Sequence, residues 1–290
     1  MSNAPFARHA AWPDGARLAL SIVVNVEEGS EASIARGDRG PEAVDELGVV
    51  LKKPLRNYGN ESNYRYGIRA GAPRVLDLLA ANGISATFTA AAMSLEAAPE
   101  LARRIAAEGH EACSHGWRWV HQFGMDEAAE RDFIAKAVTS IAKTVGTRPV
   151  GWLSRYLHTD NTRRLLVEAG FEYHMDDYSD DQPFWDTSHA RPILVMPYAL
   201  DTNDMKMWAH PAYTPRQWLE YAIDSFDVLY REGAAAPRMM SLGLHLRIIG
   251  RPGRIGALQR FLAHVRGHAG VWVATRAAIA ARWRAVSPPP

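Results

Sequence analysis

Short apolar runs alternate with longer amphipathic segments along most of the chain. Arg17 to Val26 reads RLALSIVVNV, a β-rich apolar run that predicts a first core strand. Residues 126–145 repeat apolar positions at helical spacing, with Asp126 suited to cap the first turn and Gly146 to end the helix. Further strands are expected at 86–90, 111–114, 150–153, 171–174, 193–196, 239–246 and 271–274, and further helices at 72–81, 99–108, 159–169, 215–232, 256–268 and 275–284. This alternation predicts an α/β fold with a mostly parallel sheet under covering helices, either open or closed into a barrel.

No linker of domain size interrupts this alternation, and 290 residues suit one large α/β domain. We interpret residues 1–16 as an N-terminal arm, 17–285 as one catalytic domain and 286–290 as a tail. Residues 27–66 form a long polar, glycine-containing segment without a clear period, which is typical of a functional or disordered loop. Its tyrosines at 58, 64 and 66 favour an ordered, packed loop.

Composition narrows the class of protein. The 33 basic and 32 acidic residues give a net charge of +1, so nothing indicates nucleic acid or an anionic membrane as a partner. Cys113 is the one cysteine, which excludes an internal disulfide and favours a reducing compartment. Residues 1–13 lack the apolar run of a signal peptide, and no apolar stretch approaches the length of a membrane span. We therefore expect a cytoplasmic protein that acts on a small molecule.

Polar residues follow several predicted strands, where the sites of α/β proteins lie. After the first strand come Asn25, Glu27 and Glu28, and alternation places Asn25 and Glu27 on one face with Glu28 on the other. These carboxylates are equally well explained as solvated charges at a strand end, and a register in which Glu28 is the working group stays open. His115 follows the strand at 111–114, although a single histidine is more often structural than functional.

Three later segments continue the pattern. Trp152 lies near the end of the strand at 150–153, and Asp201, Asn203 and Asp204 follow the strand at 193–196. These carboxylates and the amide suit an amide or urea edge, or else they serve as helix caps and Asx-turns. His245 lies near the end of the strand at 239–246 and is followed by a basic turn. A carboxylate with two histidines at strand ends suits water activation with acid catalysis. No serine lies in a nucleophile elbow, no glycine-rich phosphate loop is present, and Cys113 is predicted to be inert inside its strand.

The order and spacing of these segments, from about Arg17 to Trp283, resemble the polysaccharide deacetylases of carbohydrate esterase family 4. VVNVEEGSE, ACSHGWRWV, RPVGW, PYALDTNDMK and GLHLRIIGRPGR are similar to the branch of metal-independent bacterial allantoinases and cyclic-imide hydrolases. The resemblance implies a distorted (β/α)7 barrel in a single domain and a homo-oligomer, with a tetramer as the candidate state.

The chain departs from the metal-dependent members of that family at two ligand positions. Where those enzymes have an aspartate pair, the first strand ends in Asn25 with Glu27, or Glu27 with Glu28. Where they have a second histidine four residues after His115, this chain has Trp119. A catalytic zinc normally needs three protein ligands, so we expect no metal cofactor. Recruitment of zinc or another divalent metal through His121 is the less favoured alternative.

The lead hypothesis is ring-opening hydrolysis of a carbon–nitrogen bond in a small cyclic amide, ureide or imide. Glu27 would activate or orient water, and His115 and His245 would stabilise or protonate the tetrahedral intermediate. The supporting or substrate-binding candidates are Asn25, Glu28, Trp117, Trp119, Trp152, Trp185, Asp201, Asn203, Asp204 and Arg251, of which the four tryptophans would form an apolar wall. Residues 153–159 differ from the glycine- and arginine-containing turn of allantoinases, which leaves the identity of the ring open. The rival hypotheses are a metal-dependent N- or O-deacetylase of a sugar or polysaccharide, and a non-catalytic binding protein on the same barrel.

Overall fold

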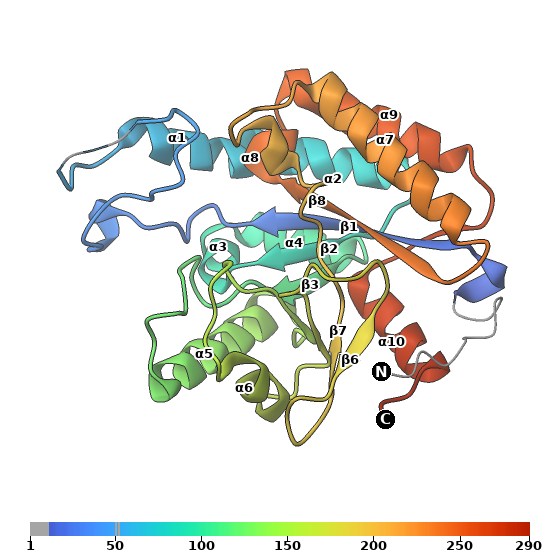
Figure 1. Cartoon of the computed structure of the whole chain (residues 1–290). Helices are drawn as coiled ribbons and strands as arrows, with labels where there is room; N and C mark the ends of the chain where they lie inside the picture. Colours follow the sequence, from blue (N-terminus) through green and yellow to red (C-terminus); the bar gives the residue numbers. More distant parts are fainter. Residues whose placement is uncertain (1–11, 50, 52) are drawn as a thin grey trace.

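A computed structural model describes residues 12–49, 51 and 53–290 and is built around one nine-stranded sheet (Figure 1). The strands are β1 (Leu18–Val26), β2 (Thr87–Ala90), β3 (Glu111–Ser114), β4 (Gly151–Trp152), β5 (Tyr173–His174), β6 (Phe184–Asp186), β7 (Ile193–Val195), β8 (Arg238–His245) and β9 (Val271–Val273). Their order is β6-β7-β5-β4-β3-β2-β1-β8, with β9 beside the start of β1, and only the β6–β7 pairing is antiparallel within the described strands.

Seven neighbouring parallel strands, from β7 through β1 to β8, curl into the expected distorted (β/α)7 barrel, so the predicted fold class is confirmed. The barrel is not closed by a ladder in the described residues, because β7 and β8 form its two parallel edges. A single β-bridge between Asn203 and Gly243 spans this gap. The connection after β7 is thereby held against β8, near the end where His245 lies.

Helices cover the outside of the curled sheet, with α2, α7 and α9 above β1 and β8 and with α5, α6 and α10 below in Figure 1. The helices are α1 (Tyr58–Tyr66), α2 (Ala72–Ala81), α3 (Ala92–Ala97), α4 (Pro99–Ala107), α5 (Glu127–Val145), α6 (Thr162–Glu168), α7 (Pro215–Glu232), α8 (Leu246–Ile249), α9 (Pro252–Arg266) and α10 (Arg276–Val286). Short 3-10 turns occupy Pro13–Gly15, Ile34–Arg36 and Asp204–Met207, and a π turn joins α1 to α2 at Gly67–Gly71. No helix of the described chain is both long enough and apolar enough to cross a membrane.

Strand β1 is buried along its whole length and orients the site. Its even-numbered residues, from Leu18 to Val26, pack in the main hydrophobic core under the helices. Ala19 instead joins the second cluster, which includes Cys113 of β3 and Tyr173 of β5 and fills the barrel interior. Because side chains alternate along a strand, Asn25 and then Glu27 continue this inward face at the carboxyl end of β1.

The segment at 27–66, expected as a loop, contains helix α1. Its sequence, YGNESNYRY, has no apolar period that would have predicted a helix. Asn57 caps the helix by accepting a hydrogen bond from the backbone N–H of Asn60, and Tyr64 is buried against Trp119. The expectation of an ordered, packed segment therefore holds for α1, where tertiary contact replaces helical periodicity as the source of stability.

The described part of the expected arm packs against the same body, whereas the last three residues of the expected tail are exposed. Residues 1–11 lie outside the described part of the chain. Trp12 is buried, its indole N–H donates to the Arg238 carbonyl, and its ring packs on Trp272 and Trp283. At the other end α10 runs to Val286. The proposed domain boundaries stay a prediction.

Candidate active site

Glu27 lies at the centre of a cluster built where three parallel strands of the sheet end, two of them adjacent and the third separated by β2. It follows β1, while His115 follows β3 and His245 ends β8. Its Oε1 atom is 3.4 Å from Nε2 of His245 and 3.7 Å from Nε2 of His115. Strand register explains the meeting, since β1 pairs with both β2 and β8 and Asn25 lies opposite His245. The structure thus brings together the three residues that the sequence singled out for catalysis.

The second nitrogen of each imidazole, Nδ1, is hydrogen-bonded on the side of the ring away from Glu27. Nδ1 of His245 is 2.7 Å from Oδ1 of Asp204, whose Oδ2 accepts hydrogen bonds from the backbone N–H groups of His245 and Ile249. Nδ1 of His115 is 2.7 Å from the Leu153 carbonyl oxygen. A carbonyl can only accept, so this Nδ1 carries the hydrogen and Nε2 is the ring nitrogen turned toward Glu27.

Charge is arranged in opposite senses on Glu27 and His245. Burial opposes ionisation of Glu27, but Arg247 and then His245 outweigh this cost and hold its pKa well below the usual value. Burial likewise opposes protonation of His245, but Glu27 and Asp204 outweigh it and raise its pKa to about 10. At neutral pH the pair is therefore a carboxylate facing an imidazolium. A carboxylate with so low a pKa is a weak base, whereas the imidazolium has a proton to donate.

Arg247 is the principal residue that sequence reasoning missed. Its side chain is fully buried, Nη1 donates to Oε2 of Glu27 at 2.7 Å, and Nε lies 3.0 Å from a carboxylate oxygen of Glu46. The guanidinium carbon lies 4.4 Å from the centre of the Tyr64 ring of α1. The available signal was its place two residues after His245 in the same motif, GLHLRIIGRPGR.

Glu28 serves the other side of the same strand end. One of its carboxylate oxygens accepts from the backbone N–H of Glu27 and the other from the backbone N–H of Arg247. Burial raises the pKa of Glu28 to about 7, although Arg247 partly opposes the rise. It does not line the cavity beside Glu27. The alternation predicted from the sequence therefore holds, with Glu27 inward and Glu28 outward.

The cavity beside Glu27 has a volume of about 30 Å³, which is enough for a water molecule. Its lining consists of Asn25, Glu27, His115, Trp119, Leu153, Ser154, Arg155, Tyr156, Tyr178, Tyr198, Asn203 and His245. Asn25 donates through Nδ2 to the hydroxyl of Tyr198 at 2.8 Å. Tyr156 and Tyr178 are about half exposed, so they form the outer edge of the cavity, and Tyr156 has a φ of 52°. Of the sequence candidates, Asn25, Trp119 and Asn203 therefore lie at the cavity together with the three proposed catalytic residues.

Three of the four expected wall tryptophans lie elsewhere. Trp152 is fully buried on the helix side of β4, edge-on to Phe133 and Phe171, because Gly151 takes the inward position of that two-residue strand. Trp117 packs under Lys136 of α5, and the indole of Trp185 donates to the Ser287 carbonyl. The aromatic wall is instead made of Trp119 and the three cavity tyrosines, Tyr156, Tyr178 and Tyr198.

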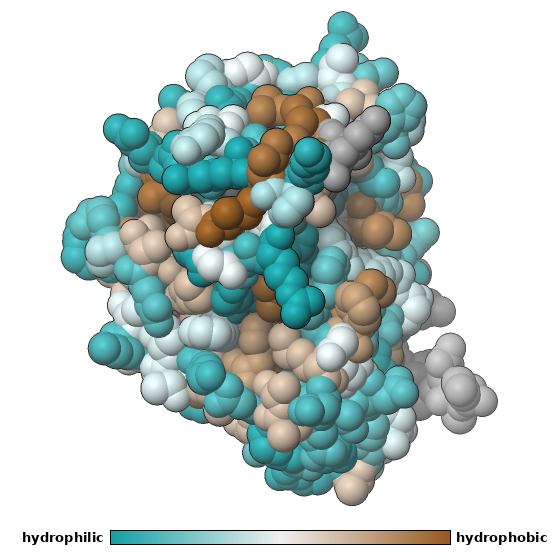
Figure 2. Space-filling view, turned by 90° about the vertical axis from the view of Figure 1, so that its left-hand side faces the viewer, coloured by the Kyte–Doolittle hydropathy of each residue, from teal (hydrophilic) through white to brown (hydrophobic). Residues whose placement is uncertain are grey.

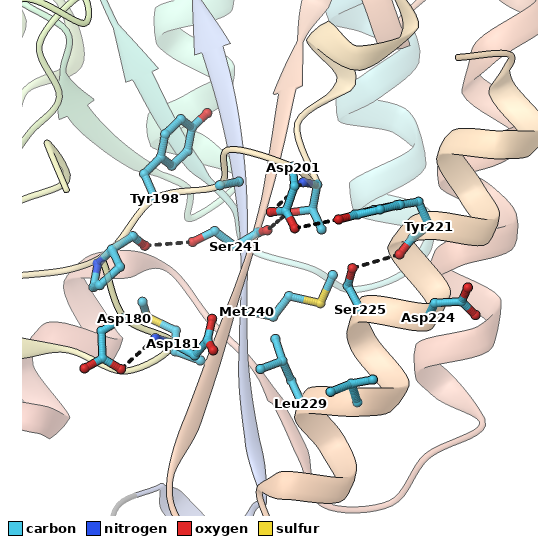
Figure 3. Close-up of a pocket in the computed structure, with 15 residues that line it drawn as sticks. Asp180, Asp181, Tyr198, Asp201, Tyr221, Asp224, Ser225, Leu229, Met240 and Ser241 are labelled. Carbon is cyan, nitrogen blue, oxygen red and sulfur yellow. Dashed lines mark hydrogen bonds between the residues drawn. The ribbon is translucent and has the colours of Figure 1, made fainter. Parts of the chain in front are cut away.

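Asp201 and Arg251 also lie apart from the cluster. Asp201 accepts a hydrogen bond from the hydroxyl of Tyr221 at the edge of a larger cavity of about 410 Å³ between α7, β8 and the connection after β7 (Figure 3). Tyr198 lines both cavities and separates them. Arg251 lies over the Tyr66 ring and donates to Asn63, on the outer side of α8. The two aspartates of the connection after β7 therefore lie in different places. Asp204 contacts Nδ1 of His245, and Asp201 lies outside the barrel.

The residues around Glu27 do not fit a three-ligand zinc site. The buried guanidinium of Arg247 is bonded to the second oxygen of Glu27, and a cation in that place competes with a metal ion for the carboxylate. Trp119 takes the position expected for a second histidine, and the centre of its ring lies 3.6 Å from the guanidinium carbon of Arg155. His121 directs Nδ1 to the Arg155 carbonyl and is not part of the cavity lining.

Comparisons with known proteins identify the family of the chain. The polysaccharide deacetylase family model matches residues 63–174. A putative polysaccharide deacetylase of Schizosaccharomyces pombe is 36% identical over 299 residues, which cover 96% of this chain and 93% of the relative. The crystal structure of a probable polysaccharide deacetylase from Pseudomonas aeruginosa PAO1 is 43% identical, with a TM-score of 0.93 over 97% of this chain and 96% of that one. The crystal structure of Puue allantoinase is also 43% identical, with a TM-score of 0.94 over 100% of this chain and 96% of that one. With its barrel and the strand ends that meet at Glu27, the chain belongs to the polysaccharide deacetylase family, in its allantoinase-like branch.

Proposed function

We propose that this hydrolase of the deacetylase family opens a small cyclic amide, ureide or imide by hydrolysing a ring carbon–nitrogen bond without a metal ion. The observation that supports this most directly is a water-sized cavity in which one carboxylate oxygen faces two imidazole nitrogens. The likeness to Puue allantoinase over the whole chain supports the same class of substrate.

The positions of the three groups give each a role. Water held by the Glu27 carboxylate attacks the ring carbonyl carbon, and Nε2 of His115 accepts its proton. The imidazolium of His245 stabilises the oxyanion and then protonates the ring nitrogen as the carbon–nitrogen bond breaks. The products are a carboxylate and the released amide, urea or amine nitrogen. In this scheme Glu27 orients water, which suits a carboxylate whose pKa Arg247 and His245 hold low.

The residues at the entrance of the cavity favour a small substrate over a polymer. Tyr156 and Tyr178 line the cavity at its solvent side, and Leu157, beside Tyr156, is also exposed. A polysaccharide deacetylase that acts on internal sugars needs an open groove across its site. Entry of a ring in our proposal requires outward movement of these tyrosines, which their exposure permits.

The experiment is a substrate panel assayed after exhaustive chelation. Allantoin, hydantoin, dihydrouracil, succinimide and maleimide are compared with acetylated chito-oligosaccharides, the latter with and without added zinc or cobalt. Turnover of at least one ring by chelated protein is expected. Acetate release that depends on the added metal would support the deacetylase hypothesis instead. Binding of a ring without turnover would support the binding-protein hypothesis, and either result overturns our proposal.

The state of assembly stays a prediction. Figure 2 shows the face at which β1 ends, where apolar side chains gather beside charged ones. Leu47 and Leu55, which precede α1, and Tyr58, its first residue, are each more than half exposed. These residues offer a surface for the homo-oligomer, with a tetramer as candidate, that the family resemblance implies. Sedimentation velocity of the full chain measures it directly.

A further inference from the structure

A group of side chains of the types that bind metal ions lies far from Glu27, where helices α7 and α9 pack on each other (Figure 1). Asp227 comes from α7, His264 from the last turns of α9, and His268 from the turn that follows. Oδ1 of Asp227 is 2.7 Å from Nε2 of His264 and 3.9 Å from Nε2 of His268. It is the one set of three or more such groups within the described residues whose donor atoms all lie within 4.8 Å of one another.

The backbone and its neighbours fix both imidazoles toward the aspartate. The two histidines are four residues apart, so they lie on one face of the helical turn. Nδ1 of His268 is 2.9 Å from the His264 carbonyl oxygen, so it carries the hydrogen and a neutral His268 has the lone pair on Nε2. Phe226 packs edge-on against both rings, and Tyr230 packs edge-on against His268. A ring nitrogen that donates to a backbone carbonyl is the usual support behind a metal-bound histidine.

We propose that Asp227, His264 and His268 form a binding site for zinc or a similar divalent transition-metal ion, independent of the catalytic cluster. Two imidazole nitrogens and one carboxylate oxygen are typical zinc donors, with bonds of about 2.0–2.2 Å. In a tetrahedral site such bonds separate the donor atoms by about 3.3 Å. The distances of 2.7 and 3.9 Å in the structure bracket this value, so small side-chain rotations complete the site. The three side chains are 25–40% exposed, which leaves a fourth position for water.

The proposed site lies at the opposite end of the barrel from the reaction chemistry. His268 leads into Gly270, whose carbonyl accepts from the backbone N–H of Arg17, immediately before β1. Glu27 follows the far end of β1, roughly 26 Å along the strand. An ion held there bridges α7 and α9 and touches no proposed catalytic residue. Zinc found in purified protein would therefore not identify a catalytic metal unless this site had first been removed.

The test uses chelated full-length protein and zinc chloride in isothermal titration. One ion per chain is expected, with the dissociation constant at least tenfold weaker in His264→Gln, in His268→Gln and in Asp227→Asn. His189→Gln is the matched control, because His189 is a partly exposed histidine outside both clusters, and His245→Gln tests the catalytic cluster. Both controls should bind zinc as the wild type does. Cobalt substitution should give visible absorption bands typical of four-coordinate geometry, lost in His268→Gln.

Three results would overturn the proposal. They are no zinc binding at 100-fold molar excess, unchanged binding in all three site variants, and loss of binding in His245→Gln. Circular dichroism and thermal unfolding of each metal-free variant establish that it is folded. If one variant fails to fold, the remaining two decide the outcome, since each removes a different ligand. The outcome is independent of the proposed ring hydrolysis, because it is read from metal binding and not from turnover.

Discussion

Substitution of Asp204 by asparagine should move the alkaline limit of activity, because Asp204 helps to keep His245 protonated. The pKa of His245 is raised from 6.5 to about 10 by Glu27 and Asp204 acting against burial. That rise corresponds to roughly 5 kcal/mol in favour of the imidazolium. A carboxylate within a few ångströms typically accounts for about 1–3 pKa units, so loss of one of the two anions should lower the pKa of His245 by about 1–2 units.

The assay is kcat/KM between pH 5 and 11 on a ring substrate that the wild type hydrolyses. We expect the wild-type rate to fall near pH 10 and the Asp204→Asn rate to fall about 1–2 pH units earlier. NMR titration of the His245 imidazole gives the same quantity without a substrate. Since the folded-state pKa lies above the unfolded value, His245 contributes full stability below pH 6.5 and loses it as pH rises through about 10. The free energy of unfolding of the variant should lose this contribution at lower pH.

Asp201→Asn provides the matched control, because the same change is made on the same connection outside the catalytic cluster. Its pH profile should coincide with that of the wild type. The reasoning is refuted if the wild-type rate already falls near pH 6.5, or if Asp204→Asn keeps the wild-type alkaline limb while remaining folded. A merely structural Asp204 would lower stability without moving the limb.

Glu27→Gln should lower kcat by about 100-fold or more and Glu28→Gln by much less, and the reverse ranking on one substrate would make Glu28 the working carboxylate. Glu27→Gln also leaves Arg247 without its 2.7 Å partner, so we expect urea unfolding to show a loss of about 3 kcal/mol, and unchanged stability would contradict this ion pair. His115→Gln should lower kcat by about 100-fold with near-native circular dichroism; near-normal turnover would remove His115 from the mechanism. Tyr156→Gly should raise KM with little cost in stability, since glycine accepts a φ of 52°, and an unchanged KM would show that this tyrosine does not contact substrate.

Local sequence patterns were sufficient to predict those features of the site that depend on a single strand. Alternation along β1 predicted that Asn25 and Glu27 share a face and that Glu28 takes the other, and the contacts of Glu28 agree. The succession of apolar runs and capped helices predicted a mostly parallel sheet under covering helices, because each short strand must bury both of its faces, and the family resemblance implied that the sheet curls into a barrel. The meeting of Glu27, His115 and His245 follows, since parallel strands in one curled sheet end at the same edge.

What the sequence alone determined is therefore the period of each element, the parallel sheet and the set of strand ends at which chemistry collects. What only the tertiary structure decided is which side chains cross between elements. Arg247 reaches Glu27 and Tyr64 because α1, which has no apolar period of its own, folds over α8. Trp152 leaves the site because its neighbour Gly151 takes the inward position. The physical reason is common to both, since periodicity fixes the face on which a residue lies, but the partner it meets depends on segments distant in sequence that pack only in the folded chain.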